Sequence, residues 1–172
     1  MDYYKKRIHD LAILGRLGRQ QSDETSTWIQ LLWFEFEQYL TELQPLFTQP
    51  LTEETVDCWG ISSDQDTFLA PPEKEGLYLA GIQVKKGTVA PKGWTYWELP
   101  DQDYLVLKTN VLLVDQTVKE IFEVILPKEQ VILTGAIQEF YAATDTPGEL
   151  WLYCPIESSI ELEKHHSTLL KR

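Results

Sequence analysis

The chain has 172 residues, of which 43% are hydrophobic and 12% are aromatic. This composition is sufficient for one domain, or one duplicated domain, with a sizeable core. The 27 acidic and 15 basic side chains give a net charge of −12, which argues against binding to nucleic acid phosphates and to anionic membrane surfaces. A cationic ligand or a basic protein partner is compatible with this charge.

The cysteines and the N-terminus favour a cytoplasmic protein. Cys58 and Cys154 lie far apart and form no CxxC motif, which is typical of a reduced protein with two buried thiols, although a single disulfide is the alternative. Residues 1–7 are basic, but no apolar segment of a signal peptide follows them. No apolar run reaches transmembrane length.

The first half of the chain is predicted to contain a strand, a helix and two further strands. Residues 8–18 have the apolar content of a strand, and strands are also predicted over residues 56–61 and 77–84. A helix is predicted near residues 24–45, because polar N-cap residues precede it and prolines follow. Apolar residues recur there at helical spacing: Trp28, Ile29, Leu32, Trp33, Phe36, Tyr39, Leu40 and Leu43.

The second half repeats this order of elements. A second helix is predicted near residues 113–126, because its apolar residues again follow helical spacing, and Pro127 is predicted to end it. Strands are predicted over residues 94–99, 103–108, 131–142 and 149–156.

The repeated order predicts an α+β fold. It consists of duplicated strand-helix-strand-strand units with a mainly antiparallel sheet and a central ligand groove. We expect a single domain over residues 1–157, with pseudo-repeats at about 8–90 and 91–157. Residues 158–172 are expected to form a charged C-terminal tail.

Glu139 is the most informative single residue, because it lies inside an apolar and aromatic strand. Alternation places Glu139 and Tyr141 on one face of that strand, and Gln138 and Phe140 on the other. Glutamate is depleted from strands and is rarely buried without a partner. If this face points inward, the charge requires an Arg or Lys of the chain or a bound cation. If it points outward, Glu139 is simply hydrated.

The sequence shows no motif for a metal, a cofactor or a nucleophilic enzyme. His165 and His166 lie in the polar tail, where solvation is the more common state. Neither a phosphate-binding glycine loop nor a G-x-S-x-G nucleophile motif is present. We therefore predict no metal and no cofactor.

Aromatic residues make up 12% of the chain and six of them are Trp, so large rings can line a pocket as well as fill a core. Core packing is the more common role for any one ring. We expect at least two members of the following set to face a pocket: Trp33, Trp59, Tyr78, Trp94, Trp97, Tyr104 and Tyr141.

The order and spacing of these segments resemble the GyrI-like effector-binding domains, which sense small molecules alone or fused to AraC- and MerR-type DNA-binding domains. The chain departs from that pattern in an acidic stretch over residues 64–75 and in the acidic residues after Pro100. The resemblance is carried by Leu14-Gly15-Arg16, Ile29-x-x-Leu32-Trp33-x-x-Phe36, Trp59-Gly60-Ile61, residues 78–84, Pro91-Lys92-Gly93, Leu99-Pro100, Tyr104-Leu105-Val106, residues 121–127, Glu139-x-Tyr141 and Tyr153-Cys154-Pro155-Ile156.

The resemblance implies that Glu139 faces a central groove and meets aromatic, cationic ligands there. The predicted ligand-binding residues are accordingly Glu139 and the seven rings named above. The protein would sequester a drug or toxin, or act as an effector sensor through a partner transcription regulator. Because few residues precede the first predicted strand, we expect no direct contact with nucleic acid.

Two other functions remain open. The first is a hydrolase of strained, electrophilic small molecules on the same scaffold, with Glu139 as the general base. The second is an interaction protein whose acidic surface binds a basic partner. Turnover of a ligand would identify the hydrolase, and salt-sensitive protein binding without a small-molecule ligand would identify the interaction protein.

Overall fold

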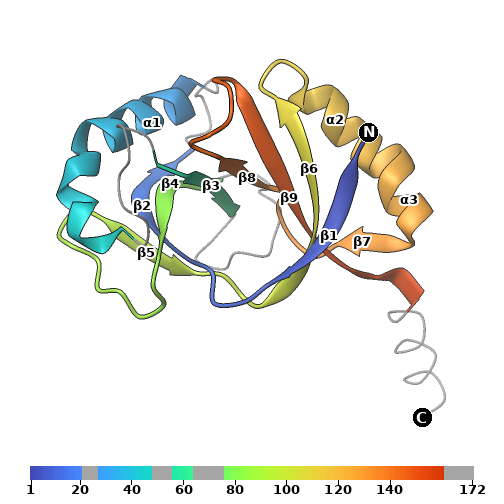
Figure 1. Cartoon of the computed structure of the whole chain (residues 1–172), viewed down its shortest axis with the longest axis horizontal. Helices are drawn as coiled ribbons and strands as arrows, with labels where there is room; N and C mark the ends of the chain where they lie inside the picture. The colour runs from blue at the N-terminus through green and yellow to red at the C-terminus, as the bar shows by residue number, and fades with distance from the viewer. Residues whose placement is uncertain (21–26, 48–55, 64–75, 161–172) are drawn as a thin grey trace, which may run out of the picture.

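The computed structural model describes residues 1–20, 27–47, 56–63 and 76–160. In this part of the chain, two helical segments lie over one strongly curved sheet (Figure 1). Every strand pair described is antiparallel. The predicted α+β fold class is therefore confirmed. The charged tail and the acidic stretch over residues 64–75 fall largely or wholly outside the described residues.

The strands form a nine-stranded sheet in the described residues, in the order β1-β6-β9-β8-β3-β4-β2-β5, with β7 paired to β9. Their bounds are Tyr3–Ile8 for β1, Ala12–Arg19 for β2, Cys58–Ser63 for β3, Leu77–Val84 for β4, Thr95–Glu98 for β5, Gln102–Asn110 for β6, Val131–Leu133 for β7, Gln138–Tyr141 for β8 and Glu149–Ser158 for β9.

The first helical segment covers the half of the sheet that contains β2 and β4. It consists of α1 (Thr27–Tyr39) and a 3-10 turn, η1 (Leu40–Leu46). Phe36 and Leu43 are fully buried against this half of the sheet. Each such side chain stabilises the fold by roughly 1.5–3 kcal/mol. The helix predicted near residues 24–45 is confirmed over its described part.

The second helical segment is longer than predicted. It runs through α2 (Val114–Glu120), a π-helical turn η2 (Ile121–Ile125) and α3 (Leu126–Glu129). Pro127 does not end it, because the wider π turn before it accommodates a residue that cannot donate a helical hydrogen bond. The helix ends instead at Gln130, which adopts a left-handed conformation (φ 55°).

Two strand predictions differ from the structure. β1 was not predicted, because four of its six residues are exposed and it shows no apolar alternation; its pairing with β6 holds it in place. The single strand expected over residues 131–142 is divided into β7 and β8. Both pair with the same edge of β9, β7 near its end and β8 near its middle.

This division allows β8 to join the two halves of the sheet. On one side β8 pairs with β9, and on the other it pairs with β3. Each half of the sheet also takes its edge strand from the other half of the sequence. The first strand, β1, pairs with β6, and β5 pairs with β2. The proposed repeat boundaries remain predictions.

The side chains form three cores on two faces of the sheet. On the helix face, one core packs under α1 and another under α2, η2 and α3. On the opposite face, which we call the open face, a third core contains Trp59, Trp97, Tyr104 and Tyr153. No helix in the described residues is long and apolar enough to cross a membrane.

Candidate functional site

Glu139 is held on the helix face by two tyrosine hydroxyl groups. The Tyr78 hydroxyl donates to Glu139 Oε1 at 3.3 Å, and the Tyr141 hydroxyl donates to Glu139 Oε2. The Tyr78 oxygen in turn accepts a hydrogen bond of 3.1 Å from Trp33 Nε1. Trp33, Tyr78, Glu139 and Tyr141 therefore form one hydrogen-bonded group, which we call the Glu139 cluster.

Three elements bring this cluster together. Glu139 and Tyr141 come from β8, Tyr78 from β4 and Trp33 from α1. Gly60 on β3 is paired with Glu139 and lies between β4 and β8. A Cβ at Gly60 would lie 1.9 Å from the Tyr78 hydroxyl oxygen, so only glycine leaves room for this hydroxyl. No pattern in the sequence around Gly60 indicates this role.

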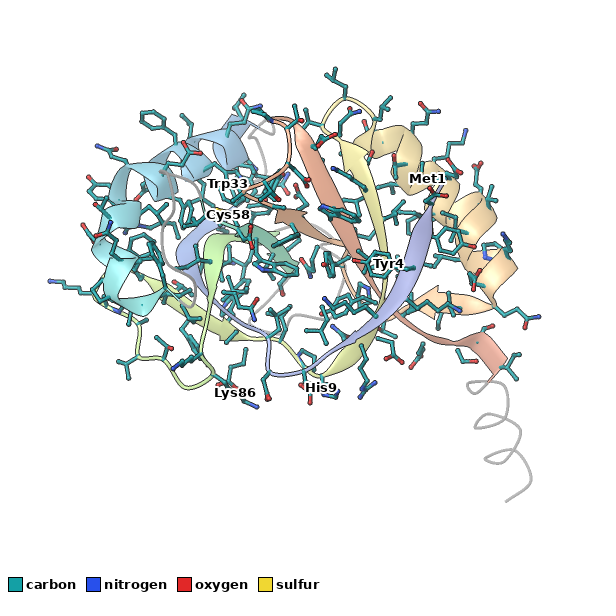
Figure 2. All side chains as sticks on the ribbon, viewed as in Figure 1. Met1, Tyr4, His9, Trp33, Cys58 and Lys86 are labelled. Atoms are coloured by element: carbon teal, nitrogen blue, oxygen red, sulfur yellow. The ribbon has the colours of Figure 1, made fainter. Side chains whose placement is uncertain are left out.

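Aromatic rings enclose the carboxylate. The Trp33 ring meets the Tyr141 ring edge to face, with centroids 5.4 Å apart, and meets the Tyr78 ring at 6.2 Å. Tyr78 is buried, with 2% of its surface exposed, whereas Trp33, Glu139 and Tyr141 are half-buried. The cluster therefore retains an accessible side, and Figure 2 shows Trp33 beside Cys58 near the junction of α1 with the sheet.

The electrostatics of the cluster are those of a desolvated acid. Burial raises the pKa of Glu139, and the hydrogen bonds from Tyr141 and Tyr78 oppose this by stabilising the carboxylate. Burial, followed by the charge of Glu139, raises the pKa of Tyr78 and of Tyr141. Both tyrosines therefore remain protonated donors. In the part of the chain that the structure describes, no Lys, Arg or His forms an ion pair with Glu139.

Cys58 borders the cluster through its pairing with Tyr141. Its thiol donates to the Val56 carbonyl at 3.4 Å. Burial, together with the charges of Glu37 and Asp57, raises the pKa of Cys58 to about 12. Both Cys58 and Cys154 are free thiols. Cys58 is therefore a neutral neighbour of the cluster and not a reactive thiolate.

The other predicted aromatic residues do not join the Glu139 cluster. Trp59, Trp97 and Tyr104 lie on the open face. Trp94 is buried on the helix face near η1, where its Nε1 donates to Glu42 at 3.1 Å. The guanidinium of Arg16 stacks on the Trp94 ring at 4.2 Å. In these positions the side chains of Trp94, Trp97 and Tyr104 are packed in the cores. Their role in ligand binding stays a prediction.

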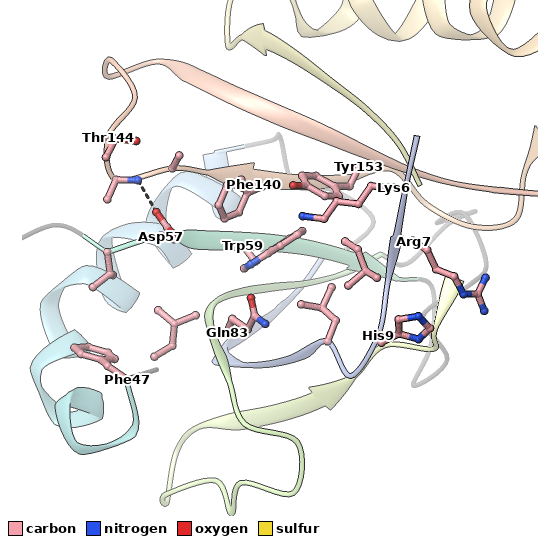
Figure 3. Close-up of a pocket in the computed structure, with 16 residues that line it drawn as sticks. Lys6, Arg7, His9, Phe47, Asp57, Trp59, Gln83, Phe140, Thr144 and Tyr153 are labelled. Carbon is pink, nitrogen blue, oxygen red and sulfur yellow. Dashed lines mark hydrogen bonds between the residues drawn. The ribbon is translucent and has the colours of Figure 1, made fainter. Parts of the chain in front are cut away.

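Trp59 lines a cavity of about 640 Å³ on the open face, which Figure 3 shows. The cavity lies among β1, β3, β4, β8 and β9. The cavity could not be located from the sequence, because residues far apart in the chain form its walls. Among the described residues, no group of three His, Cys, Asp or Glu side chains could hold a metal ion.

No protein-family model matches the sequence, and no curated protein matches it. Solved structures do. SAV2435 bound to tetraphenylphosphonium aligns with a TM-score of 0.67 and 15% identity, over 96% of this chain and 99% of the other. The EcmrR C-terminal domain aligns with a TM-score of 0.56 and 14% identity, over 91% and 98% of the two chains.

The chain shares the fold of these two proteins, which is the fold that the resemblance to GyrI-like domains implies. A protein from Staphylococcus aureus MU50, described as a putative bacterial transcription regulation protein, also shares the fold, with a TM-score of 0.63 and 13% identity, over 92% of this chain and 99% of the other. The resemblance seen in the sequence is thus confirmed at the level of the fold. EcmrR has also been solved in complex with DNA, and this chain matches 57% of that longer chain.

Proposed function

We propose that the protein binds aromatic organic cations at the Glu139 cluster. The observation that carries this proposal is a half-buried carboxylate that two tyrosine hydroxyls orient and that no cation of the described residues neutralises. A charge in such surroundings is costly to the folded protein. A bound cation would supply the missing counter-charge.

The rings of the cluster suit the same ligand. Trp33 and Tyr141 are half-buried beside the carboxylate, so their faces and edges can contact an aromatic cation. Cation–π attraction of this kind contributes roughly 0.5–2 kcal/mol per contact. The structure of SAV2435 with tetraphenylphosphonium, a cation that carries phenyl rings, supports this ligand class for the shared fold.

Calorimetric titration of Glu139→Gln tests the proposal. This substitution keeps the shape of the side chain and removes its charge. Tetraphenylphosphonium should bind the variant more weakly by on the order of 1.5–3 kcal/mol, because one charge-assisted contact is lost. Neutral triphenylphosphine oxide should lose much less affinity. Equal losses for both ligands would contradict the assignment of Glu139 as the anion of the site.

The biological role that follows is that of a sensor or a sequestering protein in the cytoplasm. Regulators among the structures of this fold support a partner transcription regulator as the recipient of the signal. We assign ligand contact to Trp33, Tyr78, Glu139 and Tyr141. Measuring whether ligand addition changes the association of the protein with a candidate regulator tests the sensor role.

Hydrolysis is a second candidate, and the raised pKa of Glu139 favours it. A carboxylate whose pKa moves toward neutrality is a better general base than a hydrated one. It would activate water for attack on a strained, electrophilic ring. Mass spectrometry of a small panel of epoxides after incubation with the protein tests this. Turnover that Glu139→Gln abolishes, with binding retained, would establish an enzyme.

A further inference from the structure

The cavity on the open face is separate from the Glu139 cluster. Glu139 and Phe140 are neighbours on β8, but their side chains point to opposite faces of the sheet. Phe140 lines the cavity, whereas Glu139 does not. The volume of about 640 Å³ lies within the range of pockets that bind small molecules. The sheet therefore separates two surfaces that can each meet a ligand.

One wall of this cavity is made of three aromatic rings. The centroid of the Trp59 ring lies 4.8 Å from that of Phe140 and 4.9 Å from that of Tyr153. Trp59 and Tyr153 are 5% and 6% exposed, and Phe140 is half-buried. Phe140 therefore keeps an accessible surface on which another planar ring can stack, and the buried Trp59 and Tyr153 rings hold it in a fixed position.

Lys6 supplies a positive charge next to these rings. Figure 3 shows its side chain extending from β1 toward Tyr153 and Trp59, whereas Arg7 and His9 point away from the rings. Arg7 pairs with Asp103 at 3.2 Å, and His9 pairs with Asp101 at 3.0 Å. Within the described ranges, Lys6 has no carboxylate partner. It is therefore the cation of this cavity that is free to meet an anion.

The remaining polar groups of the cavity are compatible with an anionic ligand. The amide of Gln83 points toward Trp59 from β4 and can donate a hydrogen bond (Figure 3). The carboxylate of Asp57 accepts a hydrogen bond of 2.8 Å from the Ala143 backbone N–H and keeps its negative charge. Because Figure 3 shows Asp57 on the side of Trp59 away from Lys6, an anionic group fits at the Lys6 side of the cavity.

We propose that this cavity is a second binding site, and that it takes planar aromatic carboxylates. The aromatic ring stacks on Phe140 beside the edge of Trp59, and the carboxylate lies between the Lys6 ammonium and the Gln83 amide. The site is opposite in charge preference to the Glu139 cluster. It does not depend on the function proposed for that cluster.

Calorimetry with three ligands of one shape tests the charge preference. The ligands are 2-naphthoate, neutral 2-naphthamide and cationic 2-naphthylmethylammonium. We expect 2-naphthoate to bind most tightly and to weaken as salt is added, because its contact with Lys6 is screened. Equal affinities for all three ligands, or no binding of 2-naphthoate at millimolar concentration, would overturn the proposal.

Two charge-matched variants locate the binding. Lys6→Gln should weaken 2-naphthoate roughly tenfold, the usual effect of losing one charge-assisted hydrogen bond. Lys92→Gln removes the same charge from an exposed turn outside the cavity and should leave the affinity unchanged. Lys6 is exposed, so its substitution should not disturb folding. Similar affinities for the two variants would refute the role of Lys6.

Glu139→Gln distinguishes this site from the one on the helix face. If the cavity binds 2-naphthoate, this variant should retain that affinity while it loses tetraphenylphosphonium. Lys6→Gln should show the reverse pattern. A loss of 2-naphthoate binding in Glu139→Gln would place that ligand at the Glu139 cluster and overturn the proposal of a second site. The proposal that the Glu139 cluster binds cations would be unaffected.

Discussion

The Tyr78 hydroxyl occupies the space in which a side chain at Gly60 would lie. The distance from a Cβ at Gly60 to the Tyr78 oxygen would be 1.9 Å, and to the ring carbon that carries it 2.6 Å. Both contacts are far shorter than real Cβ atoms tolerate. The position of the hydroxyl that orients Glu139 therefore depends on a missing side chain on the neighbouring strand.

Gly60→Ala should accordingly displace Tyr78 and break its hydrogen bond to Glu139. We expect a loss of stability of about 1–3 kcal/mol, as for other overpacked sites, measured by urea denaturation. In a Tyr78→Ala background the added methyl group has room, so the same substitution should cost much less. Additive effects in the double variant would show that the two residues do not compete for this space.

Glu139→Gln should make the stability of the protein less dependent on pH. Burial raises the pKa of Glu139 in the folded state above its unfolded value. Such a group contributes stability below its unfolded pKa, near 4.5, and this contribution is lost as the pH rises through the folded pKa. The stability of the variant relative to the wild type should therefore increase between pH 4 and pH 8. Denaturation curves at a series of pH values check the sign.

A decrease in that relative stability with rising pH would contradict the expected shift. It would mean that ionised Glu139 is stabilised in the folded protein, as an ion pair with an internal cation would require.

Binding of tetraphenylphosphonium should tighten as the pH rises, because the ionised form of Glu139 is the one that attracts the cation. The change should occur above the ordinary glutamate range, since the pKa of Glu139 is raised. Tryptophan fluorescence titrations at pH 5 and pH 8 measure it. The affinity of Glu139→Gln should stay constant over the same range. If the affinity of the wild type for tetraphenylphosphonium did not change with pH, the ionisation of Glu139 would play no part in binding.

The protein should not bind duplex DNA at physiological salt. Its net charge is −12, and association with DNA depends on Lys and Arg that displace counterions from phosphates. A mobility-shift assay with micromolar protein and mixed-sequence DNA tests this expectation. A clear shift would favour a direct regulator over an effector module.

Periodicity predicted the elements that bury one apolar face. The strand expected over residues 77–84 matches β4, and the apolar spacing of Phe36 and Leu43 identified the first helical segment. Trp94 and Trp97 belong to cores on opposite faces of the sheet, as alternation along the strand predicted over residues 94–99 requires. β1 gave no such signal, because backbone pairing with β6 and not burial holds it.

The site was predictable only in part. The Glu-x-Tyr pattern predicted that Glu139 and Tyr141 share a face, and their hydrogen bond confirms it. Trp33 and Tyr78 meet in the Glu139 cluster because of the angle at which α1 crosses the sheet. No local sequence pattern predicts that angle. The separation of Trp59 from the Glu139 cluster likewise follows from the register of β3 with β8.

That register has a mechanical consequence. Only three residue pairs join β3 to β8 in the described structure, and the Gln138 side chain adds two hydrogen bonds to the backbone of Ser62, at 2.7 and 3.2 Å. These contacts are the seam between the two halves of the sheet. The same short seam carries Glu139 on one side and Trp59 and Phe140 on the other. A ligand that separates β3 from β8 on one face of the sheet therefore also changes the shape of the binding surface on the opposite face.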